Sequence, residues 1–320
     1  EGERFMERYA PHAKDLASRD VVSRAIVTEI REGRGCGPNR DHVLLTLTHL
    51  DAEVIRKRLP AIRDLVLTFA NADLCVEPAP VFPTAHYTMG GIPTNRFGEV
   101  VAPIEQGPEE RIPGLYAAGE CACVSVHGGN RLGGNSLLDI IVFGRAAGNH
   151  IIEYLGENRY HQPLADTCLE PALERLARWE QPGDGESVDT LRKELTATME
   201  EHCGVFRTAE VLDEGVEKVL ALQQRIPDVR LRDHSQVFNT ARIEALELEN
   251  LMDVAIATMM SAQQRQESRG AHSRIDFPER DDVNWLRHSL YHKATHSVDY
   301  KPVRMKPLTV ESFPPKPRTY

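Results

Sequence analysis

Apolar residues recur at helical spacing near the start of the chain. Between Asp15 and Arg31 they stand at Val21, Val22, Ile26, Val27 and Ile30, which places them on one face of a helix. Ser18 stands where an N-cap is expected, and Asp20 adds a negative charge to the first turn. The pattern predicts a helix that begins after Ser18 and ends at Arg31, and a second helix over residues 51–71.

The middle of the chain differs in composition from the helical segments before it. In PAPVFPTAHYTMGGIPTN, residues 78–95, prolines and glycines surround a short β-like run, which is typical of loops and turns. IPGLYAAGECA, residues 112–122, predicts a buried strand followed by a turn of glycine and acid. From Ser136 to about Leu155 the chain is apolar on most faces. We predict a buried helix there, closely packed through its small residues Gly144, Ala146, Ala147 and Gly148.

The last half of the chain reads as surface helices followed by loops. Four stripes keep helical spacing: Leu169, Leu173 and Leu176; Val188, Leu191, Leu195 and Met199; Leu212, Val216, Val219 and Leu220; and the long apolar segment 243–260. These stripes predict a bundle of about four packed helices. The chain from Ser261 is rich in prolines and is predicted to be mostly loop.

Composition is that of an ordinary soluble protein. Of 320 residues, 27% are charged and 41% hydrophobic, and this length allows two or three domains with a substantial core. The net charge of −10 argues against a nucleic-acid surface. The longest apolar run, Leu137 to Phe143, is too short to span a membrane and contains Asp139. The six cysteines have neither zinc nor iron–sulfur spacing, so we predict reduced thiols and no metal site.

One glycine-rich segment carries the strongest chemical signal. HGGNRLGGNS, residues 127–136, fits neither of the common phosphate-loop patterns. Glycines expose the backbone, so that a flat ligand can lie against it. A helix starting near Ser136 would direct its free N–H groups at that ligand. Arg131 adds a planar fork that can hold a carboxylate with two hydrogen bonds. The alternative is a tight loop with a surface arginine.

Three weaker signals accompany this segment. GLYAAGE, residues 114–120, is similar to the strand–glycine–acid element with which two-dinucleotide-fold flavoproteins hold part of FAD, although a turn at a strand end explains it as well. In HYTMGG, residues 86–91, His86 precedes an aromatic residue and two glycines, and a lone histidine is often an ordinary core residue. Arg19 beside Asp20 is equally compatible with ordinary charges at a helix start.

Taken together, these segments resemble one family. HYTMGGIPT, GLYAAGECACVSVHGGNRLGGNSLLD and ESRGAHSRIDFPERDD, in this order, together with ERFMERYAP and PPKPRTY, look like the flavoprotein subunits of the succinate dehydrogenase and fumarate reductase family. The similarity runs from the first residue to the last. It is greater to succinate dehydrogenase than to fumarate reductase, and L-aspartate oxidase shares the scaffold with different motifs.

The resemblance implies roles for six residues. Arg131 and His86 correspond to substrate-binding positions, and Glu120, Ser136 and Leu137 to FAD-binding positions. Arg19 in SRDVV corresponds to the catalytic arginine that accepts a proton from succinate. Because a guanidinium normally stays protonated, that role requires a carboxylate relay and a site shielded from water.

The resemblance also implies a fold of the α/β plus α class. Residues 1–84 correspond to the remainder of a capping (substrate) domain, and 85–157 to the C-terminal return of a Rossmann-like FAD-binding domain. Residues 158–260 correspond to a helical bundle domain and 261–320 to a loop-rich C-terminal domain. The family's Rossmann glycine segment and its histidine bonded covalently to FAD have no counterpart here. Because the chain also starts without an initiator Met, we expect it to be the C-terminal portion of a longer protein.

The implied activity is oxidation of succinate to fumarate by hydride transfer to FAD. Electrons then pass to an iron–sulfur subunit and on to quinone, in the tricarboxylic acid cycle and aerobic electron transport. The resemblance places the protein peripherally on the cytoplasmic face of a bacterial inner membrane, or on the matrix side in mitochondria, with membrane-anchor subunits as further partners. The chain alone is expected to be inactive. The alternatives are a fumarate reductase flavoprotein and a non-catalytic remnant that docks on an iron–sulfur partner.

Overall fold

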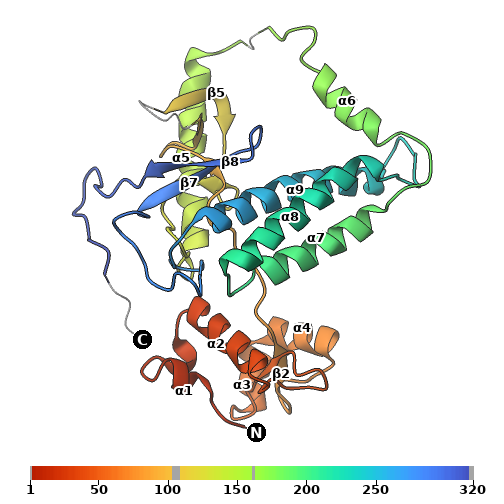
Figure 1. The fold of residues 1–320 in the computed structure, drawn as a ribbon. Helices are drawn as coiled ribbons and strands as arrows, with labels where there is room; N and C mark the ends of the chain where they lie inside the picture. Colours follow the sequence, from red (N-terminus) through yellow and green to blue (C-terminus); the bar gives the residue numbers. More distant parts are fainter. Residues whose placement is uncertain (1, 103–108, 161–162, 317–320) are drawn as a thin grey trace. The chain divides into compact units, whose positions relative to one another are not determined.

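The computed structural model describes residues 2–102, 109–160 and 163–316 (Figure 1). These residues divide into two compact units. One contains residues 2–86 and 313–316, and the other contains the described residues between 87 and 312. Both units combine helices with short strands, in agreement with the mixed α/β class expected from the sequence.

The first unit starts with two packed helices. Helix α1 (Met6–Tyr9) is followed by a short 3-10 helix (Lys14–Leu16) and by α2 (Arg19–Arg31). Val21 and Ala25 of α2 are buried against α1. The predicted bounds of α2 are confirmed, but the Ser18 hydroxyl donates to Asp20 (2.7 Å) rather than capping the helix.

The predicted helix over 51–71 is wrong as a single element. The structure has α3 (Ala52–Arg58) and α4 (Pro60–Ala70). Pro60 lacks an N–H and restricts the residue before it, so Leu59 leaves helical geometry (φ −129°, ψ 39°) and α3 ends there. The start of α3 is capped by Asp51, whose side chain accepts from the Glu53 amide.

A two-stranded ribbon completes the first unit. Strand β1 (Val43–Leu45) pairs antiparallel with β2 (Ala79–Val81), which is the short β-like run expected among the prolines. Buried Ile55, Leu74 and Ala79 form a small core between these elements.

Glu29 links α1, α2 and the turn after α2, and its carboxylate accepts from Arg34 (2.6 and 2.8 Å), Tyr9 (2.6 Å) and Arg8 (2.8 Å). The Arg34 guanidinium is the main cause that lowers the pKa of Glu29 from its ordinary value of 4.5 to about 2, against the opposing effect of burial. A lowered pKa in the folded state contributes stability above pH 4.5 that is lost as the pH falls toward 2.

We therefore expect the free energy of unfolding to fall by about 3 kcal/mol across this window because of Glu29 alone. Glu29→Gln should remove this part of the pH dependence in acid-titrated thermal unfolding. The control is Glu32→Gln, because Glu32 also pairs with Arg34 but is 53% exposed, where such pairs contribute little. Identical acid profiles for Glu29→Gln and the unsubstituted protein would contradict the assignment.

The second unit starts with two short sheets. Strand β3 (Ile92–Pro93) pairs parallel with β6 (Ala122–Cys123), and β4 (Glu99–Ala102) pairs antiparallel with β5 (Glu110–Tyr116). The strand predicted in IPGLYAAGECA is present as β5, but the prediction that it is buried is wrong, because six of its seven residues are exposed.

Helix α5 (Asn135–Glu157; Figure 1) follows the glycine-rich segment, as expected, but most of its residues are not buried. Only Asp139 and Ala147 of this helix are buried. Ala147 is the one small residue that packs closely, because a Cβ added to Gly98 would lie 2.8 Å from its methyl group. The large apolar side chains of α5 are mostly exposed within the described chain: Leu137, Leu138, Ile140, Ile141, Val142, Ile152 and Leu155. An apolar composition gives a helix its preference for burial but does not supply the surface that covers it.

Three of the four predicted later helices form a packed core. These are α7 (Val188–His202), α8 (Ala209–Arg225) and α9 (Thr240–Gln264), and they lie side by side in Figure 1. The residues that they bury include Leu191, Leu195, Leu212, Val219, Leu248, Met252 and Ile256.

The fourth predicted helix is present but is not a full member of the bundle. In α6 (Glu170–Arg178) no residue is buried. Instead Arg175 and Arg178 of α6 form ion pairs with Glu249 of α9 (2.5 and 2.8 Å), and Trp179 at the end of α6 enters the core.

The prediction that the chain from Ser261 is mostly loop missed a β-hairpin. Strands β7 (Arg287–His292) and β8 (Ser297–Pro302) pair antiparallel over their full length. The Arg287 guanidinium lies over two aromatic rings, at 4.5 Å from the Trp285 centroid and 3.8 Å from that of Tyr300. These stacking contacts tie the hairpin to the segment before it.

Candidate functional site

The six residues predicted to bind or react with ligands are divided between the units. Arg19 is the exposed first residue of α2, and His86 is an exposed residue after β2, both in the first unit. The second unit contains the other four: Glu120, Arg131, Ser136 and Leu137. Within that unit the structure brings Glu120, Arg131 and Ser136 together around one side chain, that of Tyr87.

The glycine-rich loop, residues 127–134, leaves its backbone open to a ligand. Gly128 (φ +60°) and Gly134 (φ +81°) adopt left-handed conformations that favour glycine. A Cβ added at Gly128, Gly133 or Gly134 would meet no atom within 4 Å among the described residues. Gly134 is also the N-cap of α5, so the positive end of this 23-residue helix lies beside the open backbone.

Arg131 has a charge that the described residues do not neutralise. Its Nη1 donates to the Leu132 carbonyl (3.2 Å), and its half-buried guanidinium lies 4.4 Å from the centroid of the Tyr87 ring. Its Nε is buried without a hydrogen-bond partner, and no ion pair involves Arg131 within the described ranges. A buried donor without a partner is costly, so this guanidinium is suited to an anionic ligand with two acceptor oxygens.

Tyr87 connects the loop to its surroundings. Its ring also makes an edge-on contact with His127, with the centroids 5.6 Å apart. Burial is the main cause that raises the pKa of the Tyr87 hydroxyl, and the negative charges of Asp139 and Glu120 raise it further, while a hydrogen bond with Ser136 lowers it in part. The hydroxyl therefore stays protonated at neutral pH.

A buried histidine–carboxylate pair joins the first residue of the glycine-rich loop, His127, to Asp139 of α5. His127 Nε2 and Asp139 Oδ2 are 2.8 Å apart, and their side chains are only 12% and 4% exposed. His127 Nδ1 is buried without a hydrogen-bond partner among the described residues. Sequence reasoning missed His127, Asp139 and Tyr87 as site residues, although an acid in the most apolar run of the chain was a signal for the pair.

Glu120 lies where two of the quoted motifs meet. Its carboxylate accepts from the Thr88 amide (3.0 Å), which ties GLYAAGE to HYTMGG. A Cβ added to Gly91 would lie 2.4 Å from the Cys121 carbonyl oxygen, so the approach of the two segments requires glycine. The exposed Glu120 remains accessible to a ligand hydroxyl.

Two family models match separate parts of the chain. A family model described as "FAD binding domain" matches residues 1–137, and one described as "Fumarate reductase flavoprotein C-term" matches residues 192–320. The chain is 53% identical over 318 residues to the succinate dehydrogenase flavoprotein subunit of Coxiella burnetii. The chain belongs to the succinate dehydrogenase and fumarate reductase flavoprotein family. The resemblance seen in the motifs is thereby confirmed.

Other members show the same extent of similarity. The mitochondrial flavoprotein subunit from Oryza sativa subsp. japonica is 49% identical, and the match covers 100% of this chain and 51% of that protein. A solved E. coli quinol fumarate reductase is 36% identical, with a TM-score of 0.85 over 98% of this chain and 55% of its own. The Coxiella burnetii match covers 99% of this chain and 54% of the relative. The chain thus spans about half the length of the curated relatives that it matches.

Two features are absent from the described residues. In that part of the chain no helix combines the length and the apolar character needed to cross a membrane. Nor does it contain a cluster of three or more histidine, cysteine, aspartate or glutamate side chains able to hold a metal ion.

Proposed function

We propose that this chain is part of a succinate dehydrogenase flavoprotein, in which it holds one side of FAD and binds a carboxylate of succinate. The observation that carries the proposal is Arg131, a half-buried cation with an unpartnered Nε next to an open glycine backbone. The family membership supports FAD as the flat ligand.

The residues that would hold FAD are Glu120, Ser136 and Leu137. Glu120 offers an exposed carboxylate to a ligand hydroxyl, and Ser136 and Leu137 stand in the first turn of α5, whose free N–H groups favour negative charge. When bound, FAD supplies the acceptor for a hydride. The histidine that carries FAD covalently is proposed to lie outside this chain.

The residues that would act on succinate are Arg131, His86 and Arg19. Arg131 and His86 bind carboxylates and so orient the substrate, which accounts for cationic donors from separate segments. Arg19 relays the proton that leaves the carbon next to the one that gives up the hydride, because a guanidinium can take up that proton only after it has passed its own to a carboxylate. Removal of one hydride and one proton converts succinate into fumarate.

The partners follow from the same proposal. In this proposal electrons leave for an iron–sulfur subunit and then quinone, which the family membership supports. Membrane-anchor subunits hold the complex on the cytoplasmic face of a bacterial inner membrane, or on the matrix side in mitochondria. A fumarate reductase flavoprotein is the second candidate, favoured by the similarity to solved fumarate reductases, but the greater identity to succinate dehydrogenases favours the first.

The proposal is tested with a fusion of residues 1–320 to the part of the Coxiella burnetii relative that the match does not cover. We expect this fusion protein to bind FAD, to oxidise succinate in a dye-coupled assay and to reduce fumarate more slowly. Residues 1–320 alone should retain no flavin after acid precipitation and should be inactive, because the glycine loop and Glu120 supply one side of the FAD site. A fusion that holds FAD and turns over neither substrate would favour the non-catalytic remnant.

Tyr87 offers a graded test of the Arg131 site. Tyr87→Leu removes the ring under the guanidinium, and a cation–aromatic contact contributes about 0.5–2 kcal/mol. We expect the KM for succinate of the fusion protein to rise several-fold, while Tyr87→Phe, which keeps the ring, should stay close to the unsubstituted protein. Equal KM values for the Leu and Phe variants would exclude the stacking contact as a support of Arg131.

A further inference from the structure

A second loop, far along the chain, lies directly against the glycine-rich loop. The Ala271 amide donates to the Gly129 carbonyl oxygen (2.9 Å). A Cβ added to Gly270 (φ +61°) would lie only 2.2 Å from that same oxygen, and one added to Gly129 would lie 3.0 Å from the Arg269 carbonyl oxygen. Both backbones therefore need glycine at the point of contact. Gly129 stands two residues before Arg131.

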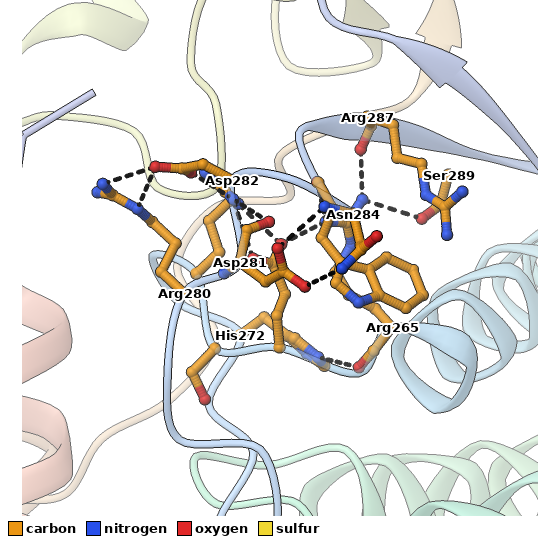
Figure 2. A network of polar contacts seen from close by, with 12 residues as sticks. Arg265, His272, Arg280, Asp281, Asp282, Asn284, Arg287 and Ser289 are labelled. Carbon is orange, nitrogen blue, oxygen red and sulfur yellow. Dashed lines mark hydrogen bonds and ion pairs between the residues drawn. The ribbon is translucent and has the colours of Figure 1, made fainter. Parts of the chain in front are cut away.

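The second loop is held by a buried carboxylate. The Glu267 side chain is fully buried and accepts from Arg269 (2.8 and 2.9 Å), from Arg265 (2.6 Å) and from the Asp281 amide (3.0 Å). Arg269 reaches onward to Asp282 (2.8 Å), which also pairs with Arg280. Figure 2 shows the Asp282–Arg280 pair in this network of polar contacts. Because Glu267 at its centre is fully buried and fully hydrogen-bonded, this network allows little displacement of the backbone that carries it.

The other end of the loop is fixed as well. His272 Nε2 donates to the Arg265 carbonyl (3.1 Å), as Figure 2 shows, and its Nδ1 accepts from Arg207 (2.8 Å). Arg274 is buried, pairs with Asp276 and donates to the carbonyls of Gln263 and Arg265. Ala271, which makes the contact with Gly129, thus stands between two anchored residues.

We propose that Arg269 and Gly270 are positioning residues for the carboxylate-binding Arg131. The Glu267–Arg269–Asp282 network fixes the backbone at residues 269–271, and the Ala271–Gly129 hydrogen bond transfers that position to the glycine-rich loop. The proposal rests on the function proposed above. A displacement of about 1 Å at a substrate-positioning group is enough to cost on the order of 100-fold in rate.

Gly270→Ala tests the contact, with Gly33→Ala as its matched control. Both glycines have left-handed conformations (φ +61° and +78°), so both substitutions strain the backbone. Only the methyl group at position 270 meets backbone, because the nearest atom to a Cβ at Gly33 is the end of the Arg40 side chain at 3.8 Å. The probe is malonate, a dicarboxylate shorter than succinate, and its binding is measured from the flavin absorbance of the fusion protein. We expect Gly270→Ala to raise its dissociation constant by about tenfold or more. Gly33→Ala should leave that constant unchanged.

Arg269 is tested separately, in case Gly270→Ala does not fold. Arg269→Gln removes the bonds to Glu267 and Asp282, whereas Arg280→Gln removes the outer pair with Asp282 and leaves the bonds of Arg269 in place. We expect Arg269→Gln to weaken malonate binding at unchanged FAD content, Arg269→Lys to restore part of it, and Arg280→Gln to have no effect. A purely structural role of Arg269 would instead lower FAD content together with malonate affinity.

Hydrogen exchange separates this inference from the proposed function. Amides of residues 127–134 should exchange faster in Gly270→Ala and Arg269→Gln than in their controls, whether or not the protein binds malonate. If the unsubstituted fusion protein holds FAD but does not bind malonate, the proposed function is contradicted. The hydrogen-exchange result then decides by itself whether Arg269 and Gly270 position the glycine-rich loop. Unchanged exchange and unchanged malonate affinity in both variants would overturn the positioning role.

Discussion

Arg131→Lys is expected to lower kcat/KM for succinate by about 30- to 900-fold, which corresponds to about 2–4 kcal/mol of lost transition-state binding. Lysine presents a single ammonium and cannot form two parallel hydrogen bonds with a carboxylate. Nor can it reproduce the contact of the guanidinium with the Tyr87 ring, whose centroid lies 4.4 Å from Arg131 Cζ. The measurement is dye-coupled succinate oxidation by the FAD-loaded fusion protein, at several succinate concentrations.

The matched control for Arg131→Lys is Arg96→Lys. Arg96 also lies over an aromatic ring, with its Cζ 4.7 Å from the Phe97 centroid, but both residues are exposed in a turn between β3 and β4. This control should keep normal kinetics and normal flavin content. Near-normal kcat/KM in Arg131→Lys would remove Arg131 from the substrate site.

Arg19→Gln is expected to abolish succinate oxidation, by at least about 100-fold if Arg19 moves a proton. The same substitution should slightly stabilise the protein. Arg19 is the exposed first residue of α2, where the positive end of the helix dipole disfavours a cation by about 0.3–1 kcal/mol. Loss of activity together with a gain of stability would separate a chemical role from a structural one. Turnover, flavin absorbance and thermal unfolding are measured on the same preparation.

Arg31→Gln is the mirror control for Arg19. Arg31 is the last residue of α2, where a cation is favourable, so its removal should cost stability and leave turnover unchanged. If Arg19→Gln keeps both its flavin spectrum and substantial succinate oxidation, Arg19 is an ordinary charge at a helix start.

Elements with purely local signals were predictable from the sequence. The stripe from Val21 to Ile30 and the position of Ser18 placed α2 correctly, because both signals lie in the helix or directly before it. The error over 51–71 arose because apolar spacing continued across Leu59 and Pro60, although proline geometry ends a helix at that point. The hairpin β7–β8 was missed because its strands are rich in charged and polar residues.

The candidate site was predictable only in part, for a related reason. Glu120, Arg131 and Ser136 were predicted because each lies in a motif that carries the resemblance. Tyr87 was missed because its contact with Arg131 joins segments 44 positions apart (131 − 87), and nothing local in either segment reports it. Burial of α5 was predicted wrongly because composition gives a preference, whereas burial depends on a partner surface.

The hydrogen bond from Ala271 to Gly129 has a consequence for synthesis of the protein on the ribosome. The two loops are 141 positions apart between Gly129 and Gly270 (270 − 129), and translation adds about 5–20 residues per second, so roughly 7–28 s separate their emergence. During that interval the Arg131 loop has already been made, but its anchor does not yet exist. A chain stalled between these loops should therefore expose residues 127–134 to protease, and their protection should arise only when the 265–282 segment has left the ribosome.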